Sequence, residues 1–566
     1  MFVEAQQLVV SAWAAVAAVS LGLGLLAGRL FGPRLERAED LWPTFWTGWA
    51  LLLCLLQVWH LFLAVDDRAR IAVATLAVLG WLVAGTAPWR LLAKALPRNI
   101  IPLLAIAATV WWLSDRSLAG PRFGDTGMYL IPTVHWYGSH AAVPGLANLF
   151  VPLGHNLSYF LYGALLDGGP LTHRIYHVIN SVLVMALLAR GLVACGRLLR
   201  RDSQGVAADL FHALALFPVM DLAVGLFLTS PSPDTGVFLF GLALAAELVV
   251  FLSQCEPSRA AMIRLVFLSA AGMTLKLSIA GLSVATGAMA LLWWLWRRRP
   301  SVGQAAAATA LVSLAAAFPL GTWMIRNVVS SGYPLYPAFV FPMPVDWIAR
   351  VDATAWIQKP MAMAPLWTVF TQWGWWQTRL LSLGWAEMDA VWPLTFVAVG
   401  ASLFVLGRLL EWRRRPAREL TVLVLVAPIA AFWFSFVNTP MPRYQGATLW
   451  ILGIDFVVLA LAAIVAGGGR LLRGAVVVAT LALAALPLVR TGEYWLGADD
   501  FEPTSSPRLH EETLASGLVV QVPENQVCWY APLPCTPEPH PGLRLREPGN
   551  LAAGFAIDPG PEPAVP

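Results

Sequence analysis

The recurrence of long apolar segments is the feature that most constrains this chain. Each segment holds roughly 18 or more residues, enough to cross about 30 Å of hydrocarbon as an α-helix. Of the 566 residues, 58% are hydrophobic and only 12% are charged, which excludes an ordinary soluble fold. The sequence therefore predicts an all-α polytopic membrane protein with about 14 spans. The expected spans are 7–31, 42–64, 70–88, 99–114, 173–194, 208–229, 233–254, 261–275, 277–296, 303–324, 388–408, 419–437, 445–466 and 472–489.

Charges between the segments predict the topology. The leading MFVEAQQ carries no positive charge, whereas Arg29, Arg34 and Arg37 follow the first apolar run. This order predicts an uncleaved first span with its N-terminus outside. Most other basic clusters then fall inside, so both termini and the long loops are extracytoplasmic. The outer segments are 115–172, 325–387 and the tail from 490. Richness in Ala, Leu, Arg and Trp is typical of a GC-rich bacterial genome and indicates a bacterial inner (plasma) membrane.

The chain divides into a transmembrane region, residues 1–489, and an outer tail, residues 490–566. Three of the five cysteines lie in spans or at their inner ends, and only Cys528 and Cys535 lie in the tail, within CWYAPLPC. An oxidising compartment would allow a disulfide between these two, although they could also be free thiols. We expect the Pro-rich tail to form a small cap or an irregular strap.

The outer segment 325–387 is rich in tryptophan, which prefers the headgroup layer of a membrane. We expect short amphipathic helices lying on the outer leaflet. Simple anchoring explains most of these rings, and a groove that seats a lipid chain is the functional alternative. The seven tryptophans are Trp347, Trp356, Trp367, Trp373, Trp375, Trp376 and Trp385.

The densest polar chemistry lies in the first long outer segment, GDTGMYLIPTVHWYGSHAAVPGLANLFVPLGHNLSYF, residues 124–160. Asp125 is flanked by Gly124 and Gly127, which allow tight turns. A carboxylate beside the outer membrane surface could accept a proton from an acceptor hydroxyl during a displacement. The alternative is that Asp125 caps the helix that follows it.

Three short motifs resemble the GT-C superfamily of membrane glycosyltransferases. Asp125, followed four residues later by Tyr129, is similar to the acid-bearing first outer loop of that group. WMIRNVVSSGYPLYP (323–337) and MPRYQG around Tyr444 resemble two of its later outer segments. The full pattern resembles a poorly characterised bacterial GT-C-like family. It differs from the best-known members in having Thr126 where they have a second acid, and in the four spans that precede Asp125.

The resemblance implies a glycosyltransferase that moves a sugar from a polyprenyl-phosphate carrier to a glycan, lipid or protein acceptor on the extracytoplasmic side. Asp125 would be the catalytic base. Lys276, Arg326 and Arg443 would hold the donor phosphate, because cationic side chains suit phosphate oxygens. Nothing indicates a metal, although a divalent cation could also serve, and no nucleic acid is expected. Snorkelling or pairing with an acid is the alternative for each cation, and Asp221 is the expected partner of Lys276.

Several other polar or aromatic residues could line a substrate cavity. For His173 and His177 helix packing is an equal alternative, and for Tyr333, Tyr336 and Tyr444 a place at the membrane interface is the commoner one. The candidates are Tyr129, His155, Asn156, His173, His177, Tyr333, Tyr336 and Tyr444.

Three other functions remain open. A lipid-linked sugar transporter or flippase would use ionisable groups near the midplane, such as Asp221 and Asp455. A surface-polysaccharide polymerase or ligase would likewise place its reactive residues in the outer loops. A non-catalytic GT-C-like protein would keep the fold without the chemistry.

Overall fold

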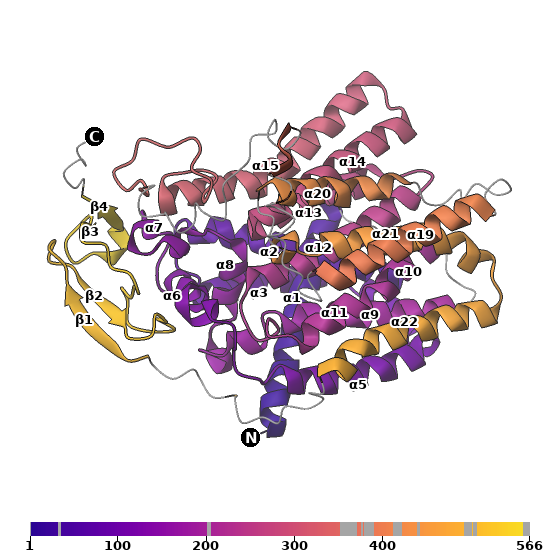
Figure 1. The fold of residues 1–566 in the computed structure, drawn as a ribbon, viewed down its shortest axis with the longest axis horizontal. Coiled ribbons are helices and arrows are strands. Elements are labelled where there is room, and N and C mark those ends of the chain that lie inside the picture. The colour runs from indigo at the N-terminus through magenta and orange to yellow at the C-terminus, as the bar shows by residue number, and fades with distance from the viewer. Residues whose placement is uncertain are drawn as a thin grey trace.

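The computed structural model describes residues 2–31, 35–200, 205–350, 371–374, 377, 390–410, 422–438, 442–491, 501 and 507–558. Most of these residues are helical, and long helices pack side by side over most of the molecule (Figure 1). The helices are α1 (Phe2–Phe31), α2 (Leu41–His60), α3 (Asp67–Ala84), α4 (Ala87–Ala95), α5 (Ile100–Arg116), α6 (Ile131–Ser139), α7 (Leu146–Leu149), α8 (Ser158–Leu166), α9 (Ser181–Leu199), α10 (Val206–Leu214), α11 (Leu216–Val224), α12 (Pro233–Ser253), α13 (Arg259–Leu275), α14 (Ala280–Arg298), α15 (Val302–Ser331), α19 (Trp392–Leu410), α20 (Val426–Asn438), α21 (Thr448–Gly467) and α22 (Arg470–Thr491).

The chain is a multi-pass helical membrane protein. In the described part of the chain, nine helices are long and apolar enough to cross a membrane, or ten if α3 and α4, bent by 75°, count as one span. This is fewer than the 14 spans that the sequence predicts. Two of the expected spans, α5 and α13, have only 17 residues. The apolar helices at 392–407 and 422–438 are also short.

The helices pack through large aromatic rings and through small residues. Trp49 of α2 lies 5.8 Å from the ring of Tyr162 in α8 and 5.7 Å from that of Phe240 in α12. By contrast, α1 and α2 approach so closely at Gly48 that an added Cβ would lie 1.7 Å from the carbonyl oxygen of Ser20. Small residues let helix backbones meet in this way in membranes.

Residues 261–296 form two helices. α13 ends at Leu275, Lys276 is extended (φ −171°, ψ 140°), and α14 begins at Ala280 after the short turn η7 (Leu277–Ile279). α13 and α14 pack against each other, so the chain reverses at Lys276. α15 in turn continues to Ser331, beyond the expected span end at 324, so Arg326 lies inside a helix and does not open a loop.

Loops gather at one end of this helical body. Asn148 donates from Nδ2 to the carbonyl of Trp347 at 2.9 Å, and Thr536 donates to the carbonyl of Leu149 at 3.0 Å. We call this the loop end: residues 117–180, 326–349 and 507–558. In Figure 1 it is the end that carries α6, α7 and the strands.

Buried ion pairs join the helices at the far end of α9. Asp209, only 1% exposed, lies 2.9 Å from Nε of Arg197 and 3.3 Å from Nη2 of Arg190. Arg197 also pairs with Glu39. These contacts bring together residues from the predicted inner segments 29–40 and 195–207.

The tail contains strands, which the sequence does not predict. β1 (Leu509–Thr513) pairs antiparallel with β2 (Val519–Pro523), and β3 (Leu543–Leu545) pairs with β4 (Phe555–Ile557). Cys528 and Cys535 form a disulfide within the segment that joins these two small sheets in the sequence. The loop that the disulfide closes contacts the segment 124–130, as described below.

Candidate functional site

Asp125 lies at the start of a short π-helical turn, η3 (Thr126–Leu130). The carboxylate is half-buried, and the Tyr129 hydroxyl donates to its Oδ2 at 3.3 Å. The side chain makes no capping hydrogen bond to the turn, so the capping role considered for Asp125 is not seen. The Asp125 carboxylate is thus oriented by a hydrogen bond from Tyr129, one turn later in the chain.

The turn that carries Asp125 is fixed on two sides. Thr126 is fully buried, and its hydroxyl lies 2.8 Å from that of Ser230. On the other side, the backbone N–H of Trp529 donates to the carbonyl of Gly127 at 2.9 Å. A Cβ at Gly127 would lie 2.4 Å from the Trp529 indole, so only glycine fits there. The disulfide loop of the tail therefore packs directly against the segment that bears the acid.

His155 lies beside Tyr129. Its ring is 6.3 Å from the Tyr129 ring and 5.7 Å from the Tyr336 ring. Within the described part of the chain, its buried Nε2 has no hydrogen-bond partner. Burial, assisted by the charge of Lys276, lowers the pKa of His155 to about 4, so the imidazole is neutral at pH 7.

Lys276 borders the same region. The hydroxyls of Ser158 and Thr274 are 2.8 Å apart, which places the chain before Lys276 against the chain after His155. Lys276 pairs with Asp234 at the start of α12, and Nζ lies 4.7 Å from the centre of the Tyr444 ring. The prediction that Lys276 pairs with Asp221 was therefore wrong.

We call Asp125, Tyr129, His155, Lys276, Asp234 and Tyr444 the polar cluster. The half-buried imidazole of His155 contacts the ring of Tyr129, which holds the carboxylate, and the charge of Lys276, which pairs with Asp234, acts on the same imidazole. Arrangements of titratable groups in such surroundings are common at functional sites, although ion-pair networks in structural positions share this property.

Arg326 is placed differently from Lys276. It is only 2% exposed, its Nη2 lies 3.0 Å from Nδ1 of His60, and its guanidinium lies 5.2 Å from the centre of the Tyr137 ring. Within the described residues, Nε and Nη1 of Arg326 have no acceptor. No described contact joins Arg326 to the polar cluster. Arg443 lies on η11 (Pro442–Gln445) next to Tyr444, but its side chain is outside the described part.

Two predicted substrate residues make buried hydrogen bonds to the backbone. Asn156 is 2% exposed and donates to the carbonyl of Trp323 at 2.9 Å, while the Trp323 indole donates back to the carbonyl of Asn156. His177 is fully buried, with Nδ1 2.6 Å from the carbonyl oxygen of Ser117. These contacts anchor both residues in the fold, and their predicted role in substrate binding stays a prediction.

Among the remaining candidates, Tyr336 lies beside His155 of the polar cluster. Tyr336 is 2% exposed and donates to the carbonyl of Val151 at 2.9 Å, and Tyr333 is also buried. His173 stacks on Tyr530 of the tail, with ring centres 3.8 Å apart. Of the seven tryptophans, Trp347 and Trp373 are described, whereas Trp356, Trp367, Trp375, Trp376 and Trp385 lie outside the described residues, as do the amphipathic helices and lipid groove expected there.

Sequence reasoning missed three participants. Asp234 follows Ser-Pro-Ser-Pro, a helix-start signal that could have drawn attention to it. Asp167 accepts the His173 N–H at 2.7 Å, and burial raises the pKa of its carboxyl. Trp529 had no local signal, because its contact with Gly127 spans about four hundred residues. Among the described residues, no group of three or more His, Cys, Asp or Glu side chains could hold a metal ion.

Comparison with known proteins gives one match. The model of a family described as "Domain of unknown function (DUF8201)" matches residues 7–450. The chain belongs to this family. The DUF8201 region includes every member of the polar cluster, and the tail with Trp529 lies beyond it. No curated protein and no solved structure matches the chain.

Proposed function

We propose that this DUF8201 protein is a GT-C-like glycosyltransferase that takes a sugar from a polyprenyl-phosphate carrier on the extracytoplasmic face of a bacterial inner membrane. The observation that carries the proposal is the half-buried carboxylate of Asp125, held by Tyr129 at the loop end. Membrane-spanning helices support this end, so a lipid-borne donor and an acceptor from the aqueous side can meet there.

The proposed reaction is a single displacement. The acceptor oxygen attacks the anomeric carbon of the sugar, and the bond from that carbon to the carrier phosphate oxygen breaks. Asp125 accepts the acceptor's hydroxyl proton, and the carrier leaves as a phosphate. The Tyr129 hydroxyl orients the carboxylate by donating to Oδ2.

Lys276 is the predicted phosphate cation best placed to stabilise the departing charge. It is held by Asp234 and by the face of Tyr444, and its side chain is 24% exposed. A fixed cation aimed at developing charge lowers the barrier because it need not reorganise during the reaction. His155, neutral at pH 7, leaves Lys276 as the positive group on its side of the cluster.

The test is transfer by the full-length protein in proteoliposomes. Polyprenyl-phosphate carriers bearing different radiolabelled sugars would be supplied with envelope extracts as acceptors, and labelled product measured. We expect Asp125→Asn to lower the rate by about 10²- to 10⁴-fold, the usual loss for a general base. Asp67→Asn is the matched control, since Asp67 follows the segment packed on α6 and its side chain is 86% exposed. Full activity in Asp125→Asn would exclude the proposed base.

One observation favours transport as a second candidate. Asp455 of α21 is 1% exposed, and its carboxylate oxygens have no hydrogen-bond partner within the described residues. An ionisable group at that depth is costly and is common in transport pathways. Loss of labelled-lipid translocation in Asp455→Asn, with no transfer in the wild type, would favour the transporter.

A further inference from the structure

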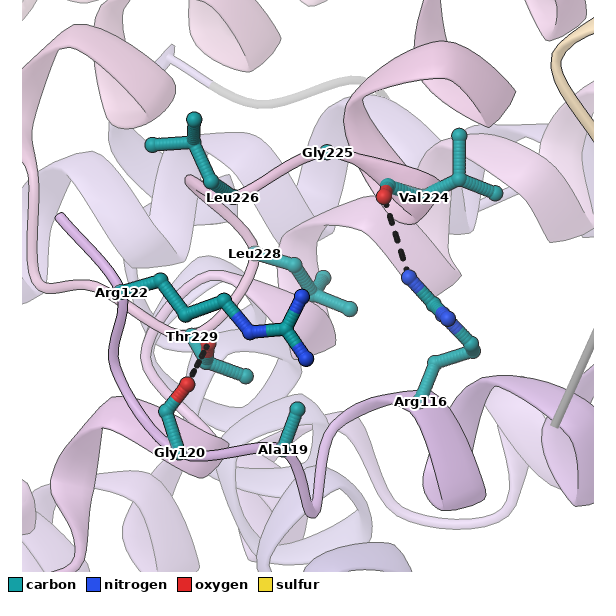
Figure 2. A pocket seen from close by; sticks show the side chains of 9 residues that line it. All are labelled: Arg116, Ala119, Gly120, Arg122, Val224, Gly225, Leu226, Leu228 and Thr229. Atoms are coloured by element: carbon teal, nitrogen blue, oxygen red, sulfur yellow. Dashed lines mark hydrogen bonds between the residues drawn. The ribbon is translucent and has the colours of Figure 1, made fainter. Parts of the chain in front are cut away.

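The small pocket between the chain that leaves α5 and the chain that leaves α11 uses its polar groups within the protein (Figure 2). Its volume is about 60 Å³. Arg116 donates from Nη2 to the carbonyl of Val224 at 3.0 Å, and Thr229 donates from Oγ1 to the carbonyl of Gly120 at 3.2 Å. Arg116 and Arg122 both have further interaction partners. These guanidinium groups are therefore already engaged.

Two buried polar side chains beside the partners of Lys276 differ in this respect. Asp234 and Tyr444 contact Lys276, and the residue that follows each of them in the chain is buried. Thr235 is 2% exposed, and Gln445 is 3% exposed. Within the described part of the chain, Oγ1 of Thr235 and both Oε1 and Nε2 of Gln445 have no hydrogen-bond partner. Three unpaired polar atoms thus belong to residues next in the chain to those that hold the lysine.

Packing brings the two segments together. The turn η11, which ends at Gln445, contacts η7, the turn that follows Lys276. A Cβ at Gly446 would lie 3.3 Å from Cγ1 of Val237, so the chain after Gln445 packs on the beginning of α12, which carries Thr235. The unpaired atoms therefore lie in two segments that contact each other and that both contact the surroundings of Lys276.

The chemistry of these atoms indicates what they could bind. An unpaired polar atom in a buried position costs free energy, and most buried polar atoms in proteins have a partner. The Gln445 amide offers donors at Nε2 and an acceptor at Oε1, and the Thr235 hydroxyl both donates and accepts. A phosphate oxygen only accepts, whereas a hydroxyl group satisfies either end of the amide. A sugar carries hydroxyls on neighbouring carbons, so it can pair with both ends of the amide and with the threonine.

We propose that Gln445 and Thr235 bind hydroxyl groups of the sugar whose phosphate Lys276 binds. This inference rests on the proposed function for its ligand, a polyprenyl-phosphate sugar, and adds the residues that select the sugar. A site built to pair with a hydroxyl rejects an analogue that lacks it, because the polar groups of the site are then left unpaired. Gln445 and Thr235 are thus specificity residues, and neither takes part in the displacement.

The test measures binding and needs no transfer. Full-length protein in phosphatidylcholine nanodiscs receives decaprenyl phosphate, or decaprenyl phosphate bearing glucose, mannose, N-acetylglucosamine or arabinose, and native mass spectrometry gives the Kd of each. We expect the wild type to bind at least one sugar-bearing carrier more tightly than the bare carrier. Gln445→Met, which keeps the length of the side chain without its polar atoms, should reduce this preference about tenfold, and Thr235→Val should reduce it less. Binding of bare decaprenyl phosphate should not change.

Two controls separate recognition of the sugar from an effect on the fold. Thr480→Val is the matched control, because Thr480 is 4% exposed and its hydroxyl donates to the carbonyl of Val476 in its own helix at 2.8 Å. It should leave the preference unchanged. Without carrier, Gln445→Met should unfold no more easily than the wild type, since it removes unpaired polar atoms from a buried position. Easier unfolding with an unchanged preference would assign the amide to a buried water molecule and overturn the subsite.

Failure of the subsite and failure of the proposed transfer give different results. If Asp125→Asn abolishes transfer while Gln445→Met and Thr235→Val keep the wild-type preference for sugar-bearing carriers, the transferase stands and the subsite is wrong. If the wild type transfers no sugar but its preference depends on Gln445, the subsite stands and the transferase is wrong. Equal binding of bare and sugar-bearing carriers by the wild type would also overturn the subsite.

Discussion

Lys276 and Arg326 look alike in the sequence and differ in the structure. Each is a lone cation at the end of an apolar run, and each was expected to hold a phosphate. Lys276 is part-exposed, paired with Asp234 and packed on Tyr444. Arg326 is 2% exposed and contacts His60 and Tyr137, with no acid beside it in the described part of the chain. The difference teaches that a cation near a membrane surface needs access as well as charge before it can serve a ligand.

The largest expected effect is on catalysis. Within the proposed transfer reaction, Lys276→Gln should lower the rate by about 10²-fold, the loss typical of one stabilising group at developing charge. Arg326→Gln should change the rate much less, because no contact in the described part of the chain joins its guanidinium to the polar cluster. Initial rates in proteoliposomes, at matched amounts of folded protein, decide this. Equal losses of transfer rate in the two variants would contradict the proposed difference between Lys276 and Arg326.

The next effect is on stability and should fall on Arg326. A buried charge without an acid is costly, so Arg326→Met, which fills similar volume, should unfold no more easily than the wild type. Arg326→Ala leaves a cavity and should be less stable than Arg326→Met by about 2 kcal/mol. Lys276→Met is the control and should change stability by less than about 1 kcal/mol. Unfolding in detergent, followed by tryptophan fluorescence, gives all three values.

If Arg326→Met instead loses several kcal/mol, the guanidinium must have an acceptor outside the described residues.

A third effect should appear in the titration of His155. Lys276→Gln removes a nearby positive charge, so the pKa of His155 should rise from about 4 toward the ordinary value of 6.5, by less than one pH unit because burial is the larger cause. Arg326→Gln should leave that pKa unchanged. Nuclear magnetic resonance of labelled histidine in the two variants measures both.

The same depressed pKa affects stability. Since the unfolded chain protonates this imidazole near 6.5 and the folded one only near 4, the folded state loses stability as pH falls through that window. His155→Gln should therefore lessen the acid sensitivity between pH 6.5 and 4, by at most about 3 kcal/mol. An unaltered pH profile in this variant would show that the pKa of His155 is not lowered in the folded protein.

The smallest effect should follow Asp234→Asn. The pair with Lys276 is part-exposed, with side chains 24% and 18% accessible, and such pairs contribute about 0–1 kcal/mol. Unfolding should therefore hardly change, whereas removing the competing carboxylate should strengthen any phosphate contact that Lys276 makes. Weaker carrier binding in Asp234→Asn would mean that the acid positions the lysine, and that its charge competes little.

The sequence predicted the helical membrane body because apolar runs are local signals. It also located Asp125 and Lys276 as residues worth attention. It could not supply the partner of Lys276, since Asp221 and Asp234 are equally plausible until the helices are packed. For the same reason it could not supply the buried contacts that Asn156 makes with Trp323 and that Nδ1 of His177 makes with Ser117. The strands of the tail escaped prediction because they are only three to five residues long.

The contact between Trp529 and Gly127 has a consequence for biosynthesis. Nearly the whole chain must be translated before the indole that covers Gly127 exists, and its loop is closed by the Cys528–Cys535 bond. The segment bearing Asp125 thus reaches its final surroundings late, after the helices around it have been inserted. A nascent chain halted before residue 528 would carry the polar cluster yet leave that segment uncovered. We therefore expect the segment to be covered only after residue 529 has been translated and the disulfide loop has formed.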